Sequence, residues 1–264
     1  MFSFASCSRT TVACLLIFGS VGGCAKDLSF SPTPGGEKVT ITVKVPKDLI
    51  TDSMHVMYRS SICKRIAHDS NGRPEPLDGY NGYEMELKRA GNDDTFSAQL
   101  FVDGGGPCEW HLSNVRFGVS YPVPNVLGED VIEGAGGNII VVFDHNNPQL
   151  QTGSSWTAEG PDLNVVKDYY PWIHESYTRG HQKWAMLADE EGGTFTYEAR
   201  QARNIYFEPV LHRDYVVRSA EPKKHKRGDY ITFVYPDGTK QFDGRAVPDF
   251  EKMQNIRLKA IANK

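Results

Sequence analysis

The stretch KVTITVKV, residues 38–45, decides the fold class. Every second residue from Val39 to Val45 is apolar, and the residues between them are threonine or lysine. Because successive side chains of a strand point to opposite faces, this alternation predicts a half-buried β-strand. We therefore expect a sheet that packs one of its faces against a core.

Similar patterns recur at short intervals along the chain. They predict strands at Met54–Cys63, at residues 109–121 and at Ile139–Phe143. The last of these is apolar throughout, which indicates a central strand. Within 109–121 the alternation changes phase near Ser113 and Asn114, which predicts a β-bulge or a corner.

Turn residues separate these strands. Residues 83–102 predict a hairpin, because two alternating runs flank the turn AGNDD at residues 90–94. Residues 68–82 are rich in glycine, proline, asparagine and aspartate and predict a loop. This spacing, without long helical periods, is typical of an all-β protein, and we expect an antiparallel β-sandwich at residues 37–145.

The remainder of the chain, residues 146–264, predicts a second β-rich region. Tyr230–Asp243 predicts a hairpin around the turn PDGT, and Asp249–Ile261 predicts a short C-terminal helix. The sequence leaves open whether this region has a core of its own or shares one with residues 37–145.

The N-terminus has the features of an export signal. A short apolar run, VACLLIF at residues 12–18, follows Arg9 and is too short to span a bilayer. The sequence SVGGC at residues 20–24 resembles the lipobox of bacterial lipoproteins, in which the cysteine receives a diacylglycerol. We expect residues 1–23 to be removed and Cys24 to carry the lipid. The alternative is an ordinary signal peptide that ends at a chance cysteine.

This resemblance implies a protein held in the periplasm by lipid, since two or more acyl chains anchor a protein stably. Ala25 stands where an aspartate commonly signals inner-membrane retention, so we expect attachment to the outer membrane. The proline- and glycine-rich residues 24–36 predict a flexible tether between lipid and fold.

The cysteines support export independently. Once Cys7 and Cys14 leave with the signal and Cys24 is lipidated, only Cys63 and Cys108 remain. A single pair in an oxidising compartment predicts a disulfide, and two buried free thiols are the alternative. The sequence contains no CxxC pair or histidine–cysteine cluster beside them, so we expect no metal site.

Charge excludes some partners. The chain has 29 basic and 33 acidic side chains, and loss of Arg9 with the signal changes the net charge from −4 to −5. This mild negative charge, together with export, argues against nucleic-acid binding. The basic run at residues 223–227, KKHKR, predicts a solvated loop or a contact with anionic lipid or an acidic partner.

No motif indicates catalysis. The sequence lacks the G-x-S-x-G, HExxH, P-loop and dinucleotide-binding patterns, and its glycine cluster at residues 104–106 is typical of a sharp turn. His145, His174 and His212 have nearby acidic residues in the sequence, but none has a spacing specific to one chemistry. We therefore expect a protein that is not an enzyme and needs no cofactor.

Aromatic residues are concentrated at residues 156–184. We singled out Tyr169, Tyr170, Trp172 and Arg179 as candidate partner-binding residues, because tyrosine, tryptophan and arginine anchor protein interfaces. Two other interpretations remain open at this point. The aromatic side chains can pack in the core, or they can stack on sugars.

One segment carries a family resemblance. The sequence VDGGGPCEWHLSNVRFGV at residues 102–119, with the upstream Cys63, resembles periplasmic lipoproteins of Gram-negative bacteria. These are immunity proteins paired with phospholipase effectors of type VI secretion. The likeness covers mainly residues 37–145 and transfers no effector-binding residue. It implies a lipid-anchored, non-enzymatic protein that binds an incoming lipase and blocks its active site.

Three hypotheses follow. The first is an immunity protein that neutralises a secreted phospholipase. The second is an envelope structural, assembly or glycan-binding lipoprotein. The third is a hydrolase with an unrecognised site, which predicts that one of the three histidines meets a carboxylate in a cleft.

Overall fold

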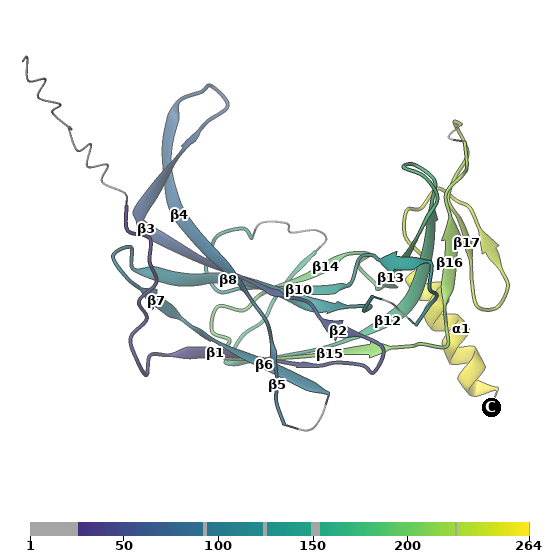
Figure 1. Cartoon of the computed structure of the whole chain (residues 1–264), viewed down its shortest axis with the longest axis horizontal. Helices are drawn as coiled ribbons and strands as arrows, with labels where there is room; N and C mark the ends of the chain where they lie inside the picture. Colours follow the sequence, from purple (N-terminus) through teal and green to yellow (C-terminus); the bar gives the residue numbers. More distant parts are fainter. Residues whose placement is uncertain (1–25, 92–93, 124–125, 149–153, 225, 264) are drawn as a thin grey trace, which may run out of the picture.

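The computed structural model describes residues 26–91, 94–123, 126–148, 154–224 and 226–263. It is mainly β, with 51% of residues in strands and 6% in helix. The strands form two sheets, and the helix α1 (Phe250–Ala262) follows them at the C-terminus (Figure 1). The all-β fold class, the short C-terminal helix and the Cys63–Cys108 disulfide are thereby confirmed.

The first sheet has ten strands. They are β1 (Lys38–Lys44), β5 (Lys88–Arg89), β6 (Thr95–Phe101), β9 (Val131–Glu133), β12 (Asp162–Ser176), β13 (Gln182–Ala188), β15 (Asn204–Leu211), β16 (Val217–Ala220), β17 (Thr232–Val234) and β18 (Lys240–Gln241). Their order is β18-β17-β16-β12-β15-β1-β6-β5, and β13 pairs with both β12 and β9.

The second sheet has eight strands. They are β2 (Ile50–Thr51), β3 (Met54–His68), β4 (Pro74–Met85), β7 (Asp103–Gly105), β8 (Trp110–Ser120), β10 (Gly137–Val142), β11 (Ser155–Thr157) and β14 (Thr194–Glu198). Their order is β11-β14-β10-β8-β3-β4, with β2 and β7 paired to β8. The central position predicted for Ile139–Phe143 is confirmed, since β10 lies between β14 and β8.

The core lies where the two sheets face each other. Val39, Ile41 and Val43 of β1 are fully buried, as their alternation predicts. They belong to one cluster with Phe117 of β8 and Phe207 of β15, whose rings meet edge to face with centroids 6.1 Å apart. This cluster draws on both halves of the chain.

The predicted division at residue 145 is therefore wrong as a domain boundary. Strand β1 pairs with β15, and β10 pairs with β14, so strands from residues 146–264 complete both sheets. A smaller second cluster does form in the C-terminal part, where Tyr170 and Trp172 pack with Phe233 and with Met253 of α1. Only this end of the molecule resembles a separate core.

The antiparallel pairing predicted for residues 37–145 is confirmed, and the parallel pairs of these strands join them to strands of residues 146–264. Strand β1 pairs antiparallel with β6 but parallel with β15, and β10 pairs antiparallel with β8 but parallel with β14. Parallel pairing requires long crossover connections. Here the chain makes each such connection by passing through the other sheet before it returns.

The N-terminal part of the second sheet combines confirmed and corrected predictions. The bulge expected near Ser113 is confirmed, because the pairing of β3 with β8 shifts between Asn114 and Leu112. The hairpin at residues 83–102 is mostly wrong: β4 pairs with β3, and only Lys88–Arg89 pair with β6. The chain crosses from one sheet to the other between β4 and β5.

Residues 68–82 are not a simple loop, because β4 begins at Pro74. Strands β3 and β4 extend beyond the rest of the sheet as a two-stranded ribbon, residues 61–80, which we call the β3–β4 arm (Figure 1). The prolines at 74 and 76 are compatible with this strand because β4 is at the edge of its sheet, where its free side needs no donor.

The expected flexible tether is fixed to the fold over much of its length. Ser31 forms a bridge with Gly105, and its backbone N–H donates to Gly104 O at 2.9 Å. The ring of Phe30 packs against Tyr58 and Trp110, with centroid distances of 4.9 and 5.8 Å. We call residues 27–31 the docked segment. Cys24 and the signal lie outside the described residues.

Candidate functional site

A cleft opens around the connection between β9 and β10. Three cavities, of about 680, 520 and 290 Å³, share lining residues in the segment 133–136. Ala135, which is exposed, lines all three of them. The segment is rich in glycine, so little side-chain volume separates one cavity from the next.

The largest cavity is polar and acidic. Its charged lining consists of three carboxylates opposed by one arginine and one histidine, namely Asp52, Glu86, Glu133, Arg116 and His55. Ser120 Oγ donates to Asp52 at 2.5 Å. Burial raises the pKa of Asp52, and this hydrogen bond only partly opposes the rise. The excess of carboxylates favours a cationic group as the occupant of this cavity.

The smallest of these three cavities, of about 290 Å³, is mainly apolar. Its walls come from Trp172, from Met186 and Leu187 of β13, and from Val247 beside α1. Asp189 lies at its edge, and its Oδ1 accepts backbone N–H bonds from Glu191 and Gly192 at 2.9 and 2.7 Å. Burial raises the pKa of Asp189 to about 6, because desolvation outweighs these hydrogen bonds. An apolar side chain of a partner fits this compartment.

A histidine lies between the apolar cavity and the third one. His174 lines both, and its Nδ1 lies 2.8 Å from Ser219 Oγ. On its other side, Nε2 lies 3.6 Å from Glu221 Oε1. Burial lowers the pKa of His174 more than the nearby Glu221 carboxylate raises it. The lowered pKa favours the neutral ring.

This serine–histidine–glutamate arrangement is the closest approach to a hydrolytic triad in the described residues. Ser219 is only 3% exposed, and its Oγ accepts the indole N–H of Trp172 at 2.7 Å. In the tautomer whose Nε2–H faces Glu221, His174 Nδ1 accepts the hydroxyl proton of Ser219, and the indole and the imidazole both contact the oxygen. A nucleophile must reach the reacting carbon, and Ser219 has no such access. The arrangement orients Trp172 and His174 as cleft walls.

Glu221 is held as an anion by the neighbouring turn. Burial raises its pKa, but a backbone N–H bond from Tyr177 at 3.0 Å and hydroxyl bonds from Ser176 and Thr178 outweigh this and lower the pKa to about 2. The carboxylate thus fixes the β12–β13 turn beside His174. Its role in the described structure is to position this wall of the cleft.

Of the other two histidines, His212 meets a carboxylate. Its Nε2 lies 2.6 Å from Asp168 Oδ1, and Asp168 also accepts a bond from Gln254 of α1 at 2.7 Å. The ring of His212 packs at a tilt against Tyr170, with centroids 4.9 Å apart and planes inclined by 32°. This network joins β12 to α1. His145 lies in a loop and lines a small separate cavity of about 160 Å³ with Asp144.

The candidate partner-binding residues are mostly in the core. Tyr169 and Tyr170 are fully buried, so the expectation that these two contact a partner is corrected. Trp172 is 5% exposed and lines the apolar cavity, so its contact with a partner stays a prediction. Their alternation along β12 directs them into the two clusters, Tyr169 toward the larger and Tyr170 and Trp172 toward the smaller. Arg179 is exposed in the β12–β13 turn and stays a prediction. Because Tyr169, Tyr170 and Trp172 are buried, stacking of sugars on their rings is also disfavoured.

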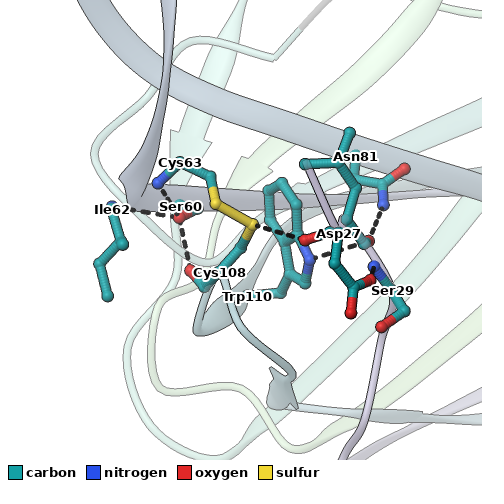
Figure 2. The surroundings of a disulfide bond; sticks show 9 residues. Asp27, Ser29, Ser60, Ile62, Cys63, Asn81, Cys108 and Trp110 are labelled. Atoms are coloured by element: carbon teal, nitrogen blue, oxygen red, sulfur yellow. Dashed lines mark hydrogen bonds between the residues drawn. A yellow bond between two sulfur atoms is a disulfide. The ribbon is translucent and has the colours of Figure 1, made fainter. Parts of the chain in front are cut away.

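The predicted disulfide is present and lies at the root of the β3–β4 arm. Cys63 and Cys108 are joined, with their Cα atoms 5.3 Å apart (Figure 2). Ser60 Oγ donates to Cys108 O at 2.5 Å and accepts the backbone N–H of Cys63 at 2.9 Å. The docked segment lies beside it, with Asp27 O 3.5 Å from the Sγ of Cys108.

Two further findings concern metal ions and membranes. Among the residues that the structure describes, no group of three or more histidine, cysteine, aspartate or glutamate side chains is arranged to hold a metal ion. Within the same residues, no helix has the length and apolar character needed to cross a bilayer.

Comparison of the chain with protein-family models, with curated proteins and with solved structures finds no match. The functional argument therefore depends on the geometry of this molecule and on the sequence features described above. Sequence reasoning missed the cleft because its walls come from β2, β3, β8, β12, β13 and the segment 133–136, which no local pattern connects. The only local signal was the glycine-rich EGAGG at residues 133–137.

Proposed function

We propose that this protein is a lipid-anchored periplasmic binding protein that neutralises a secreted phospholipase, as an immunity protein does. The observation that carries the binding role is the cleft around Ala135, in which an acidic and an apolar cavity adjoin. Such a cleft suits a protruding protein segment that inserts a basic side chain on one side and an apolar side chain on the other. The resemblance of residues 102–119 supports the choice of partner.

The surroundings of the cleft support binding rather than hydrolysis. Ser219, the hydroxyl nearest to a histidine in the cleft wall, is enclosed by Trp172 and His174. Rigid walls also favour tight inhibition, because a preorganised surface loses little entropy on binding. The sheets, the disulfide and the α1 network supply that rigidity.

The test uses the mature protein with Cys24→Ser, which removes the lipid, and a secreted bacterial phospholipase as the candidate partner. We expect the enzyme to be recovered by the immobilised protein and to lose activity at equimolar protein. Ala135→Trp fills the meeting point of the cavities and is expected to weaken binding at least tenfold. The matched control is Ala90→Trp, which changes another exposed alanine that is distant from Ala135 in the sequence. This variant is expected to bind normally.

Two results would contradict the proposal. Equal inhibition by the wild type and by Ala135→Trp would place the binding surface elsewhere. Recovery of cell-wall or assembly components, with no effect on any lipase, would favour the alternative of an envelope structural or assembly lipoprotein.

A further inference from the structure

The β3–β4 arm exposes large apolar side chains. Ile62, Ile66 and Tyr80 are 52%, 61% and 46% exposed, and Leu28 of the docked segment is 44% exposed. Ile66 is directly opposite Pro76, which is also exposed, so the two form a continuous apolar surface across the strands. Such a concentration of apolar groups on one projection is typical of a contact surface.

The arm is held in its extended shape. A two-stranded ribbon alone is marginally stable in water. Here the disulfide fixes the root, Lys64 Nζ pairs with Asp78 at 2.6 Å, and the guanidinium of Arg65 lies over the ring of Tyr80 at 5.4 Å. These contacts keep the apolar side chains presented to the outside. The arm is neutral, since its three basic and three acidic residues, Lys64, Arg65, Arg73, Asp69, Glu75 and Asp78, balance.

The docked segment limits the length of chain between the root of the arm and Cys24. The segment is bound from Asp27 onward, where Trp110 Nε1 and Asn81 Nδ2 donate to Leu28 O at 3.2 and 2.8 Å (Figure 2). Three residue steps separate Cys24 from Asp27, and extended chain covers at most about 11 Å in that number of steps. A lipid on Cys24 therefore holds this root near the headgroups of the bilayer.

A second surface projects from the same side of the molecule. The loop between β16 and β17 and the β3–β4 arm both point away from α1, toward one side of the body (Figure 1). This loop exposes four cations, Lys223, Lys224, Lys226 and Arg227, followed by Tyr230, which is 52% exposed. Lysine and arginine attract anionic headgroups, and tyrosine favours the membrane interface.

We propose that the β3–β4 arm and the β16–β17 loop together form a membrane-contact face, on which the anchored protein rests against the phospholipid bilayer. The arm inserts its apolar side chains at the interface, and the loop binds anionic headgroups. This inference rests on the proposed lipid anchor at Cys24. It fixes the orientation of the protein, with α1 directed away from the membrane.

The test labels the lipidated protein on vesicles of phosphatidylethanolamine and phosphatidylglycerol. An environment-sensitive fluorophore is attached at Ile66→Cys in the arm, at Lys224→Cys in the loop, and at Ile261→Cys in α1 as the matched control. Ile66 of β3 and Ile261 of α1 are similarly exposed, at 61% and 54%. The arm and α1 lie on opposite sides of the molecule (Figure 1). Co-flotation with vesicles measures the anchor, and lipid-borne quenchers measure proximity to the bilayer.

We expect the Ile66 label to shift to the blue and to be quenched, the Lys224 label to be quenched, and the Ile261 label to be unaffected. Equal behaviour of all three labels on floating protein would overturn the membrane-contact face while leaving the anchor intact. Protein that does not float would instead refute the anchor itself. A change at Ile66 only after a partner protein is added would assign the arm to protein binding and overturn the inference.

The unlipidated protein supplies a second measurement. Its weak partitioning onto the same vesicles is expected to fall about tenfold for Ile62→Ser/Ile66→Ser, with no dependence on salt. For Lys223→Glu/Lys224→Glu we expect a loss of about fivefold per lysine that disappears at high salt. Unchanged partitioning of both variants would contradict the proposal.

Discussion

Reduction of the Cys63–Cys108 disulfide is expected to lower the free energy of unfolding by about 4 kcal/mol. The two cysteines are 45 residues apart, and the loop they close contains β4 to β7, which belong to both sheets. In the unfolded chain the cross-link removes the entropy of a loop of that length. A loss of this size is about a thousandfold change in the folding equilibrium.

The native fold should survive this loss. Without the cross-link, the root of the arm keeps the bond from Ser60 Oγ to Cys108 O and the backbone pairing of β3 with β8. We therefore expect the reduced protein to remain folded in water but to unfold at much lower denaturant concentration. Amides of the arm should exchange hydrogen faster than those of β8 and β10, because the arm loses its covalent connection to the body.

The measurement is denaturant unfolding of the mature Cys24→Ser protein, with and without reductant, followed by tryptophan fluorescence. Cys63→Ala/Cys108→Ala in the absence of reductant is the control, and it should match the reduced protein and ignore the reductant. A difference below about 1 kcal/mol would refute the reasoning. It would mean that the loop is already constrained in the unfolded chain.

Three further substitutions test other parts of the fold. Gly79→Ala should destabilise the protein by about 2 kcal/mol in denaturant unfolding, because a Cβ there would lie 1.8 Å from the backbone oxygen of Cys63. Asp189→Asn should remove a pH dependence of stability. Burial raises the pKa of Asp189 from its ordinary value of 3.8 to about 6, so the folded protein binds the proton more tightly than the unfolded chain does. Unfolding free energy of the wild type, relative to the variant, should therefore fall by up to about 3 kcal/mol as pH rises from 4 to 6, and parallel pH profiles would contradict this. Asp249→Ala should cost about 1 kcal/mol in thermal unfolding, because Asp249 caps α1 by accepting the N–H of Lys252 at 3.1 Å; an unchanged melting temperature would count against that role.

Local sequence patterns predicted those elements in which one face is buried and the other is exposed. The alternation of β1, the change of phase at Ser113, and the Tyr230–Asp243 hairpin are all confirmed. The helix predicted at Asp249–Ile261 is present at Phe250–Ala262, with Asp249 as its N-cap. In each case the information lies within a few residues, because strand alternation, bulges, turns and caps are local properties.

Predictions that depend on distant pairing were wrong. The boundary at residue 145 failed because β14 and β15 complete sheets begun by β10 and β1, and no local feature of either partner indicates this. The loop predicted at residues 68–82 failed because Pro74 and Pro76, strong turn signals in isolation, are tolerated in an edge strand. The buried state of Tyr169, Tyr170 and Trp172 likewise depends on what packs over β12.

The features of the candidate site likewise divide into those that the sequence predicts and those that depend on distant pairing. The disulfide was predicted by counting cysteines. Only Cys63 and Cys108 remain once the cysteines of the expected signal and the expected lipid-bearing Cys24 are set aside. The cleft was not predicted, because Asp52, Arg116 and Glu133 come from separate segments of the chain and meet only after both sheets have formed. The proposed basic loop was visible as a charge run, but its projection to the same side of the body as the arm follows from the fold (Figure 1).

The position of the disulfide acquires a reason once the arm and the docked segment are considered together. Three links converge on the root of the arm: Cys63 is bonded to Cys108, Ser60 donates to Cys108 O, and Asn81 donates to Leu28 O. The first two join the arm to the residues just before β8, and the third joins it to the docked segment. A force applied through a lipid at the N-terminus would therefore act first on the arm root and pass into the second sheet through a covalent bond. An anchor attached in this way would hold the whole fold in one orientation, which a freely flexible tether would not.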